Sequence, residues 1–266
     1  MADQLLIHPT SLIHPSASLS PSVRVGPFCL VGPNVTLGAN TTLLSNVTIS
    51  GRTTVGSNCT IHPYTALGGP SQAIADNNSS DSGSLTIGNN CTIRESVTAN
   101  LGLSPAGTVI GNNCLILANA HVAHDCIVGD EVILVNGVLL AGHVKVGKGA
   151  IIAGGAGVLQ FAEVGEYAYV GGKSVVSRDV LPFSMVKGFR ARTVGVNVVG
   201  LRRRGWGDGR IKRVEKGVGI VLRGDREGLE EEEDGEGDLK RLADFVKGSK
   251  RGVCLGRIEG KGVSKI

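Results

Sequence analysis

Aliphatic residues recur every six positions along most of the chain. The longest unbroken run of this register comprises Ile110, Ile116, Val122, Val128, Leu134, Leu140, Val146, Ile152, Val158, Val164, Val170 and Val176. An earlier run in the same register comprises Ile7, Ile13, Leu19, Val25, Val31, Leu37, Leu43, Ile49, Val55, Ile61 and Leu67. The position four residues after each aliphatic is mostly small or β-branched, as at Thr41 and Ala120. Neither the helical period nor simple strand alternation fits this pattern, so we interpret it as a repeat array in which both positions face a core.

Glycine commonly follows the aliphatic residue, which indicates short strands separated by sharp bends. The pattern resembles the hexapeptide repeat of left-handed parallel β-helices, in which three hexapeptides form one triangular coil. Coils of this kind stack through main-chain hydrogen bonds and rise roughly 4.8 Å each. We therefore predict a mainly β fold, with a left-handed parallel β-helix over residues 1–186. Its handedness follows from the resemblance and not from the pattern.

The register breaks twice, at residues 68–84 and at about residues 99–108. Both stretches interrupt a repeat that resumes after them, so we interpret them as loops that project from the coils. Insertions on one face of a solenoid often line a binding surface. Neutral surface loops are the alternative interpretation.

The repeat ends beyond Pro182, where charged residues become more frequent. Apolar residues in the segments 211–221 and 239–246 have helical spacing, with Asp238 placed as an N-cap and Gly248 as a C-terminal stop. We predict a small C-terminal α-helical domain over residues 187–266.

Composition limits the function classes. The net charge of +4 is modest and no nucleic-acid-binding motif is present, so we expect no nucleic-acid partner. No stretch approaches the ~20 apolar residues of a membrane span, and no signal or transit segment is readable before Ile7, so we expect a cytoplasmic protein. Five cysteines occupy the inward small position of the repeat and are expected to be buried thiols of a reducing compartment: Cys29, Cys59, Cys91, Cys114 and Cys126.

The candidate chemistry lies where polar residues interrupt the repeat, in the segment 118–126. His121, His124 and Asp125 fall between inward positions, so we expect their side chains to face outward. A histidine with a neighbouring carboxylate to orient its ring is suited to act as a general base on a hydroxyl group. The segment contains no GxSxG motif and no outward cysteine, so direct transfer is favoured over a covalent intermediate.

An offset of 18 residues places equivalent positions on adjacent coils. His124 then lies under Gly142, and Gly142 lies under Gln160. Alongside, Asp125 lies under His143, and His143 lies under Phe161. We expect His124 and His143 to be roughly 6 Å apart, with Gly142 leaving a notch beside His124. An isolated surface histidine is usually inert, and the convergence of several polar groups argues against that alternative here.

Several motifs resemble one enzyme family. They are the N-terminal run IHPTSLIHPSASLSPSVRVGPFCLVGPNVTLG, followed by IRESVT, NAHVAHDC, LLAGHVKVG, QFAEVG and GVNVVGLRRRGW. Over about residues 7–206 the chain resembles the acyl-ACP:UDP-N-acetylglucosamine O-acyltransferases of lipid A biosynthesis. NAHVAHDC and GVNVVGLRRRG are more specific than the hexapeptides, which many acyltransferases share.

The resemblance implies a reaction and a set of roles. His124 would be the general base on the 3-hydroxyl of UDP-N-acetylglucosamine, with Asp125 supporting it and the backbone of Gly142 stabilising the oxyanion. The acyl donor would be a (3-hydroxy)acyl chain on the phosphopantetheine of acyl carrier protein, with no cofactor or metal of the enzyme's own. Substrate-binding positions would be His121, His143, Gln160, Gly172, Asn197, Arg203 and Arg204. The family forms a homotrimer with sites between subunits.

The chain also departs from the family pattern. Residues 98–102 replace the segment that commonly reads IHRGT, so a substrate-contacting His and Arg are absent. Ala73 replaces an Asp that would bind the acyl 3-hydroxyl, Leu159 replaces a His beside Gln160, and Val199 replaces an acidic residue. These departures keep two alternatives open, altered acyl specificity and a non-catalytic scaffold.

A third alternative is a zinc enzyme of the γ-carbonic anhydrase type, which resembles this chain in fold and binds zinc with three histidines at a trimer interface; His121, His124 and His143 would be the ligands. The outward spacing of these histidines and the neighbouring Asp125 and Gln160 fit that pattern poorly.

Overall fold

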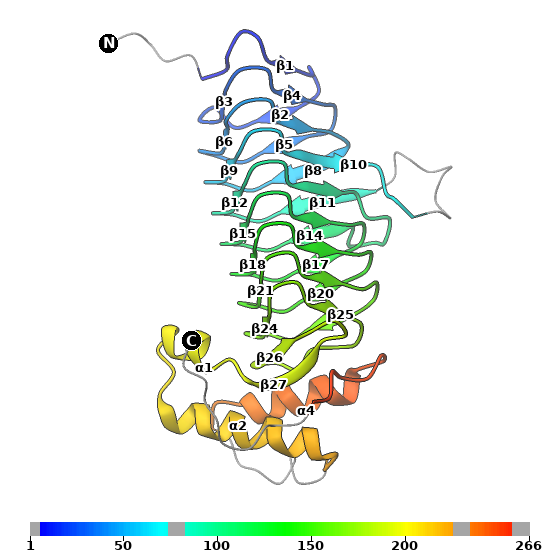
Figure 1. The fold of residues 1–266 in the computed structure, drawn as a ribbon. Helices are drawn as coiled ribbons and strands as arrows, with labels where there is room; N and C mark the ends of the chain where they lie inside the picture. Colours follow the sequence, from blue (N-terminus) through cyan, green and yellow to red (C-terminus); the bar gives the residue numbers. More distant parts are fainter. Residues whose placement is uncertain (1–5, 74–82, 226–234, 257–266) are drawn as a thin grey trace.

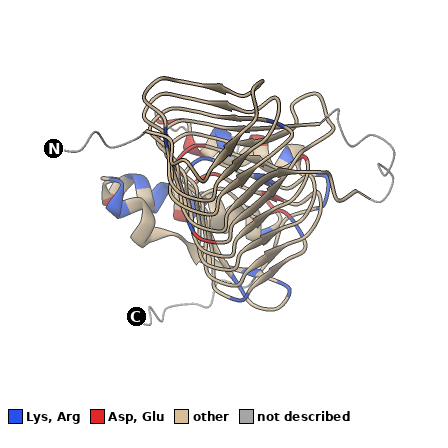
Figure 2. Ribbon diagram, turned by 90° about the horizontal axis from the view of Figure 1, so that it is seen from above, with Lys and Arg blue, Asp and Glu red and all other residues tan. Residues whose placement is uncertain are grey.

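The computed structural model describes residues 6–73, 83–225 and 235–256, and it has the predicted left-handed parallel β-helix. Two-residue strands alternate with tight turns, and strands of successive coils pair in parallel at the predicted interval, as in Leu12↔Leu30. The coils stack into a long prism with the helices at its C-terminal end (Figure 1). Viewed along the prism, the coils superimpose as nested triangles, and charged residues are sparse on their walls (Figure 2).

Each wall of the prism is one sheet. The first wall is β1 (Leu12–Ile13), β4 (Leu30–Val31), β7 (Thr48–Ile49), β10 (Ala66–Gly69), β13 (Thr98–Asn100), β16 (His121–Val122), β19 (Leu139–Leu140), β22 (Gly157–Val158) and β25 (Val175–Val176). The second wall is β2 (Ser18–Leu19), β5 (Thr36–Leu37), β8 (Arg52–Val55), β11 (Ser84–Ile87), β14 (Thr108–Ile110), β17 (Ile127–Val128), β20 (Lys145–Val146) and β23 (Glu163–Val164). The third wall is β3 (Arg24–Val25), β6 (Thr42–Leu43), β9 (Thr60–Ile61), β12 (Thr92–Ile93), β15 (Leu115–Ile116), β18 (Ile133–Leu134), β21 (Ile151–Ile152), β24 (Tyr169–Val170), β26 (Ser184–Lys187) and β27 (Arg192–Val196).

The core follows the six-residue register. Register aliphatics such as Ile116 and Leu134 are fully buried, and so are the small residues four places later, such as Ala120. The five cysteines of the repeat are buried and free, as predicted, and Cys254 is also buried and free. A narrow prism filled by aliphatic side chains explains how the chain folds with only 3% aromatic residues.

Most turns of the repeat have one residue in the left-handed conformation, three places after the register aliphatic. Asparagine often takes this position, as at Asn34 (φ 60°) and Asn113 (φ 56°), because it tolerates positive φ better than other side chains. Asp125 (φ 61°) and His143 (φ 60°) occupy the same position on neighbouring coils. The local conformation of these two candidate residues is therefore set by the repeat itself.

The two predicted insertions leave the prism at the corner that follows the first wall. The strands on either side bound them at residues 70–83, between β10 and β11, and at residues 101–107, between β13 and β14. Residues 74–82 of the first insertion lie outside the described part. Both insertions therefore lie at the corner where the turn after β16 carries His124.

The C-terminal region packs helices under the last coils. β26 and β27 pair antiparallel, and α1 (Val198–Arg203), α2 (Asp208–Arg223) and α4 (Asp238–Gly248) follow. A second core forms beneath the prism from Leu181, Phe183, Leu201, Ile211, Val214, Val218, Ile220, Val221, Leu239, Leu242 and Val246. Asp238 is not the predicted N-cap: Gly237 caps α4, and Asp238 is its first residue, paired with Arg210. Within the described residues, no helix is long and apolar enough to span a membrane.

Candidate active site

The predicted catalytic residues lie together in three stacked turns. His124 and Asp125 follow β16, Gly142 and His143 follow β19, and Gln160 follows β22. Parallel pairing of these three strands places the turns directly above one another. The predicted separation of the two histidines is also confirmed, since the ring centroids of His124 and His143 are 5.1 Å apart.

His124 and Asp125 form a hydrogen-bonded pair. Nδ1 of His124 lies 2.8 Å from Oδ2 of Asp125. These side chains lie outside the prism core, as predicted, but they are not on the surface: His124 is 6% exposed and Asp125 is 7% exposed. The turn of the next coil covers His124, and the second insertion covers Asp125, which shields the pair from water.

Hydrogen bonds hold both the carboxylate and the backbone of Asp125. The backbone N–H of Ser104, in the second insertion, donates to Oδ1 (2.7 Å), and the backbone N–H of Asp125 donates to Oγ1 of Thr108 (2.8 Å). Burial alone would raise the pKa of the Asp125 carboxyl, but hydrogen bonds from His124 and Ser104 outweigh burial and lower the pKa below its usual value. An ionised carboxylate only accepts hydrogen bonds, so the neutral His124 ring carries its proton on Nδ1 and leaves Nε2 free to accept one.

Gly142 makes room for the His124 ring. A Cβ atom placed at Gly142 would lie 2.5 Å from Nε2 of His124 and 2.6 Å from Cε1. The predicted notch therefore exists, and the imidazole of His124 fills it. Any side chain at this position would displace the ring.

The repeat also indicates where the Gly142 N–H points. Residues two places after a register aliphatic use their N–H outside the sheet ladder: Asn112 donates to Oδ1 of Asp130 (2.7 Å), one coil further on. Proline occupies the same repeat position at several coils, for example Pro33 and Pro63, because the ladder does not use that N–H. Gly142 holds this position, and Gln160 lies one coil beyond it. The Gly142 N–H is thus oriented toward the side of Gln160.

His143 completes a column of rings. Its Nε2 lies 3.9 Å from Oδ2 of Asp125, and its ring stacks on Phe161 with centroids 4.6 Å apart and planes inclined by 10°. Phe161 comes one coil later, at the same turn position as His143. The 18-residue offset predicts that His143 lies under Phe161, and the stack confirms it.

His121 is fixed separately. Its Nδ1 lies 2.7 Å from Oγ1 of Thr98 on the preceding coil. Burial lowers the pKa of the His121 imidazole, which favours the neutral ring. His121 faces the same groove as His124 but does not join the His124–Asp125 pair.

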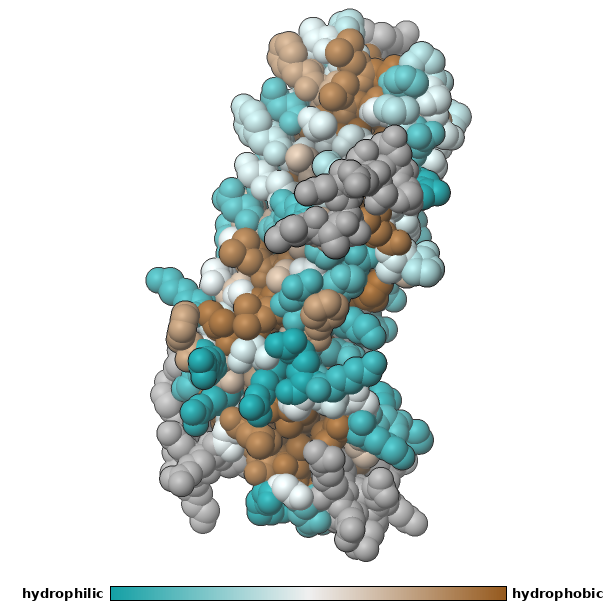
Figure 3. All heavy atoms as spheres, turned by 90° about the vertical axis from the view of Figure 1, so that its right-hand side faces the viewer, coloured by the Kyte–Doolittle hydropathy of each residue, from teal (hydrophilic) through white to brown (hydrophobic). Residues whose placement is uncertain are grey.

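A groove of about 860 Å³ runs along this face of the prism. Its polar lining includes Gln72, His121, His124 and Gln160, and Gln72 and Ala73 belong to the first insertion. Its remaining lining is mostly aliphatic or glycine: Ala123, Leu139, Leu140, Ala141, Gly142, Gly157, Val158, Leu159 and Val175, together with His143. Figure 3 shows one side of the prism, where hydrophobic patches alternate with polar side chains. An apolar groove beside a histidine–carboxylate pair can hold an alkyl chain with its reactive end at the pair.

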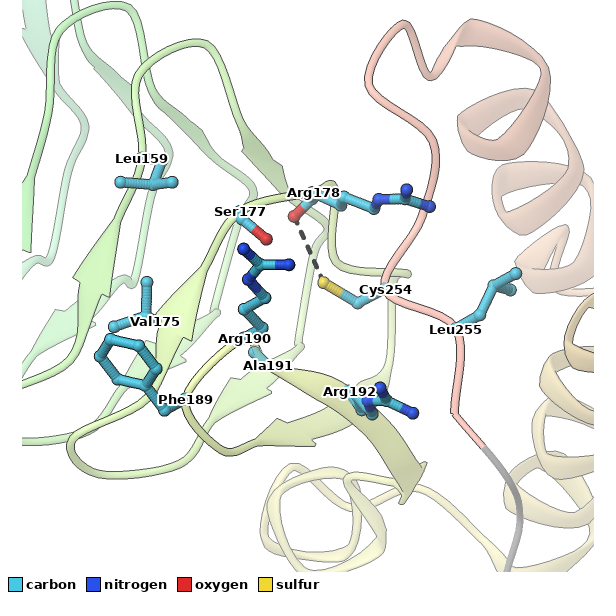
Figure 4. Close-up of a pocket in the computed structure, with 10 residues that line it drawn as sticks. All are labelled: Leu159, Val175, Ser177, Arg178, Phe189, Arg190, Ala191, Arg192, Cys254 and Leu255. Atoms are coloured by element: carbon cyan, nitrogen blue, oxygen red, sulfur yellow. Dashed lines mark hydrogen bonds between the residues drawn. The ribbon is translucent and has the colours of Figure 1, made fainter.

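A second pocket, of about 540 Å³, shares Leu159 and Val175 with the groove. Three arginines, Arg178, Arg190 and Arg192, line it together with Cys254, whose thiol donates to the carbonyl oxygen of Arg178 (Figure 4). The groove thus leads from the histidine pair toward a cationic pocket, which suits an anionic group.

The remaining predicted residues lie elsewhere on the chain. Gly172 belongs to the turn after β24, at a different corner. Asn197 is buried and caps α1: its Oδ1 accepts the N–H of Gly200, and its Nδ2 donates to the carbonyl of Tyr167. Arg204 pairs with Glu131 (2.6 Å), and Arg203 is exposed. Within one chain, these residues are not brought to the His124 corner.

The structure does not assemble the three-histidine zinc site of the alternative interpretation. Among the described residues, the metal-ligating side chains that converge are His124, Asp125 and His143. His121 is not a member of this cluster. Within one chain, the three histidines of the γ-carbonic anhydrase interpretation are therefore not brought together.

Comparisons with known proteins agree with this geometry. Residues 179–254 match the family model described as UDP N-acetylglucosamine O-acyltransferase, domain 2, and residues 107–142 match the bacterial transferase hexapeptide repeat. The UDP-N-acetylglucosamine acyltransferase of Francisella novicida is 33% identical with a TM-score of 0.90, and the alignment covers 94% of each chain. The O-acyltransferase of Moraxella catarrhalis is 35% identical with a TM-score of 0.89, covering 94% of this chain and all of its own. The chain belongs to the UDP-N-acetylglucosamine O-acyltransferase family.

Sequence alignments to individual family members cover a smaller share of the chain than the structural alignments do. The acyl-[acyl-carrier-protein]–UDP-N-acetylglucosamine O-acyltransferase of Alkalilimnicola ehrlichii is 43% identical over 169 residues, which cover 60% of this chain and 66% of that protein. The match therefore spans slightly less than two thirds of this relative's length.

Several residues at which we expect the chain to depart from the family pattern make specific contacts in the structure. Asn100, in the replaced segment, donates from Nδ2 to the carbonyl of Pro70 (2.7 Å) and so ties down the start of the first insertion. Leu101 is 2% exposed and belongs to the hydrophobic core. Ala73 and Leu159 line the groove, and Val199 is exposed on α1. At these positions the chain therefore supplies an anchoring hydrogen bond and apolar contacts.

Proposed function

We propose that this protein transfers a (3-hydroxy)acyl chain from acyl carrier protein to the 3-hydroxyl of UDP-N-acetylglucosamine, the first step of lipid A biosynthesis. Family membership supports the substrate pair. The observation that carries the proposal is the buried pair of His124 and Asp125, with Nε2 of His124 free beside Gly142. The apolar groove next to this pair accommodates the acyl chain.

The proposed mechanism needs no covalent enzyme intermediate. Nε2 of His124 accepts the proton of the sugar 3-hydroxyl while the oxygen attacks the thioester carbon. Asp125 holds the tautomer that leaves Nε2 available and stabilises the imidazolium that forms. The tetrahedral intermediate then expels the phosphopantetheine thiolate, which takes the proton back from Nε2.

The Gly142 N–H is the proposed donor to the oxyanion. It lies beside the base and, from its repeat position, is not used by the ladder. Preorganised backbone donors of this kind contribute about 10²–10³ in rate in acyl transfer. Gln160, one coil further on, lines the same groove and is the proposed side-chain contact to the acyl or sugar group.

We further propose a homotrimer in which each site is shared. The His124 corner holds the base, whereas Gly172 and the Arg203–Arg204 pair lie at other corners of the same chain. In a three-fold assembly these residues serve the site of a neighbouring copy. Light scattering on the purified chain should report the mass of three subunits, and a monomer at micromolar concentration would contradict shared sites.

Two features support altered donor specificity as a second candidate. Asn100 anchors the start of the first insertion, and Ala73 stands where the family pattern has an Asp. They give less support to a non-catalytic scaffold, because the base, its carboxylate and the notch at Gly142 are all intact. An acyl-transfer assay with UDP-N-acetylglucosamine and 3-hydroxyacyl carrier protein tests the proposed function. Absence of transfer with matched acyl carrier proteins of several chain lengths would reject it.

A further inference from the structure

Three potential metal-ligating side chains converge at the active-site corner. His124, Asp125 and His143 each offer a ligand atom, and these atoms all lie within 4.8 Å of one another. Oδ2 of Asp125 is shared: it lies 2.8 Å from Nδ1 of His124 and 3.9 Å from Nε2 of His143. Two imidazoles and one carboxylate form a donor set that Zn²⁺ commonly uses.

The spacing suits a four-coordinate ion. Bonds of about 2.0–2.2 Å in a tetrahedron place neighbouring ligand atoms about 3.3–3.5 Å apart. The two separations in the structure, 2.8 Å and 3.9 Å, lie on either side of this range. Zn²⁺ binding would open the closer contact and close the longer one, each by less than 1 Å.

The surroundings hold the ligands in place. Oδ1 of Asp125 accepts the N–H of Ser104, and the ring of His143 is held against Phe161. Such outer contacts are typical of metal sites because they orient the ligands. His124 and His143 line the groove, and the groove lining includes no Lys or Arg, so no cationic side chain there opposes a cation.

We propose that His124, Asp125 and His143 form an inhibitory binding site for Zn²⁺. Coordination through Nδ1 of His124 replaces the hydrogen bond to Asp125 and moves the Nδ1 proton to Nε2. The ring stays neutral, but Nε2 now carries a proton and cannot accept one from a sugar hydroxyl. Zinc therefore acts here as a reversible inhibitor and not as a cofactor.

Binding and inhibition are separate parts of this inference. Binding depends only on the three side chains, whereas inhibition rests on the proposed function of His124. A metal-binding measurement distinguishes the two, because it does not require the chain to be active.

The test uses the full chain after treatment with a chelator. Co²⁺ reports the site through its visible absorption bands, and calorimetry gives the Zn²⁺ affinity. His143→Asn and Asp125→Asn remove one ligand each and keep a residue that the turn accepts, since asparagine holds this turn position at other coils. His62→Ala is the matched control, because His62 pairs with Glu95 on another coil and lies outside the cluster.

We expect micromolar or tighter Zn²⁺ binding that weakens at least about tenfold in both Asn variants and is unchanged in His62→Ala. We also expect Zn²⁺ to suppress acyl transfer over the same concentration range. Full-affinity binding in His143→Asn, or no binding by the unaltered chain at micromolar Zn²⁺, would overturn the site. Metal binding that weakens in both Asn variants, in a chain without transferase activity, would support the site and count against the proposed function instead.

Discussion

Replacing Gly142 with alanine should remove most activity without unfolding the protein. The added Cβ would lie 2.5 Å from Nε2 of His124 and 2.6 Å from Cε1, about 1 Å inside ordinary contact distance. Both His124 atoms belong to the rigid imidazole ring, so neither can move without the rest of the ring. The ring must turn away, which breaks its 2.8 Å bond to Asp125 and misplaces the base. Loss of a positioned general base costs about 10²–10⁴ in rate, so we expect kcat/KM to fall at least about 10²-fold.

The matched control for this variant is Gly154→Ala. Gly154 holds the same repeat position at another corner, and a Cβ there would meet its nearest atom at 3.4 Å, an ordinary contact. Both variants should have similar circular dichroism and melting curves, apart from about 1.5–3 kcal/mol for the charge-assisted hydrogen bond lost in Gly142→Ala. Near-normal kcat/KM in Gly142→Ala would refute the assigned position of the His124 ring.

Three further predictions follow from other contacts. Ala73 cannot accept a hydrogen bond from an acyl 3-hydroxyl, so discrimination between hydroxylated and plain acyl donors should be weaker than is usual in the family, by about 1–3 kcal/mol. Competition between matched hydroxylated and plain acyl carrier proteins measures this discrimination. A strong preference for the hydroxylated donor that persists in Asp76→Ala would contradict the prediction; Asp76 lies outside the described residues. Phe161→Ala should lower kcat by releasing His143 from its stack while Phe161→Trp largely restores it, and equal activity in all three proteins would show that the stack has no role. Asp179→Ala should lower the free energy of unfolding by about 2–3 kcal/mol, because buried Asp179 accepts from the Glu163 N–H and Ser249 Oγ; unchanged urea denaturation would contradict this.

Most of the fold could be predicted because the repeat couples sequence directly to geometry. One register specifies the buried positions, such as Val122 and Leu140, and its period specifies which residues stack on adjacent coils. The same offset placed His124, Gly142 and Gln160 in one column. The predicted helices also exist, but the cap of α4 was misplaced by one residue, because Asp238 pairs with Arg210 and leaves the capping position to Gly237.

The supporting contacts could not be predicted to the same extent. Ser104 reaches Asp125 from an insertion without the repeat, and no periodicity locates such a residue. Burial of His124 depends on the neighbouring turn and insertion, which outward-facing positions in the pattern do not reveal. The N-cap role of Asn197 depends on where α1 begins, and the predicted domain boundary at residue 187 did not specify that.

The most direct test of the central claim is the acyl-transfer rate of His124→Ala with UDP-N-acetylglucosamine and 3-hydroxyacyl carrier protein. The side chain lies outside the prism core, so the variant should still melt as a folded β-helix, apart from about 1.5–3 kcal/mol for the lost hydrogen bond to Asp125. We predict that its rate falls roughly 10²-fold or more. A folded His124→Ala variant with near-normal transfer would contradict the assignment of His124 as the general base.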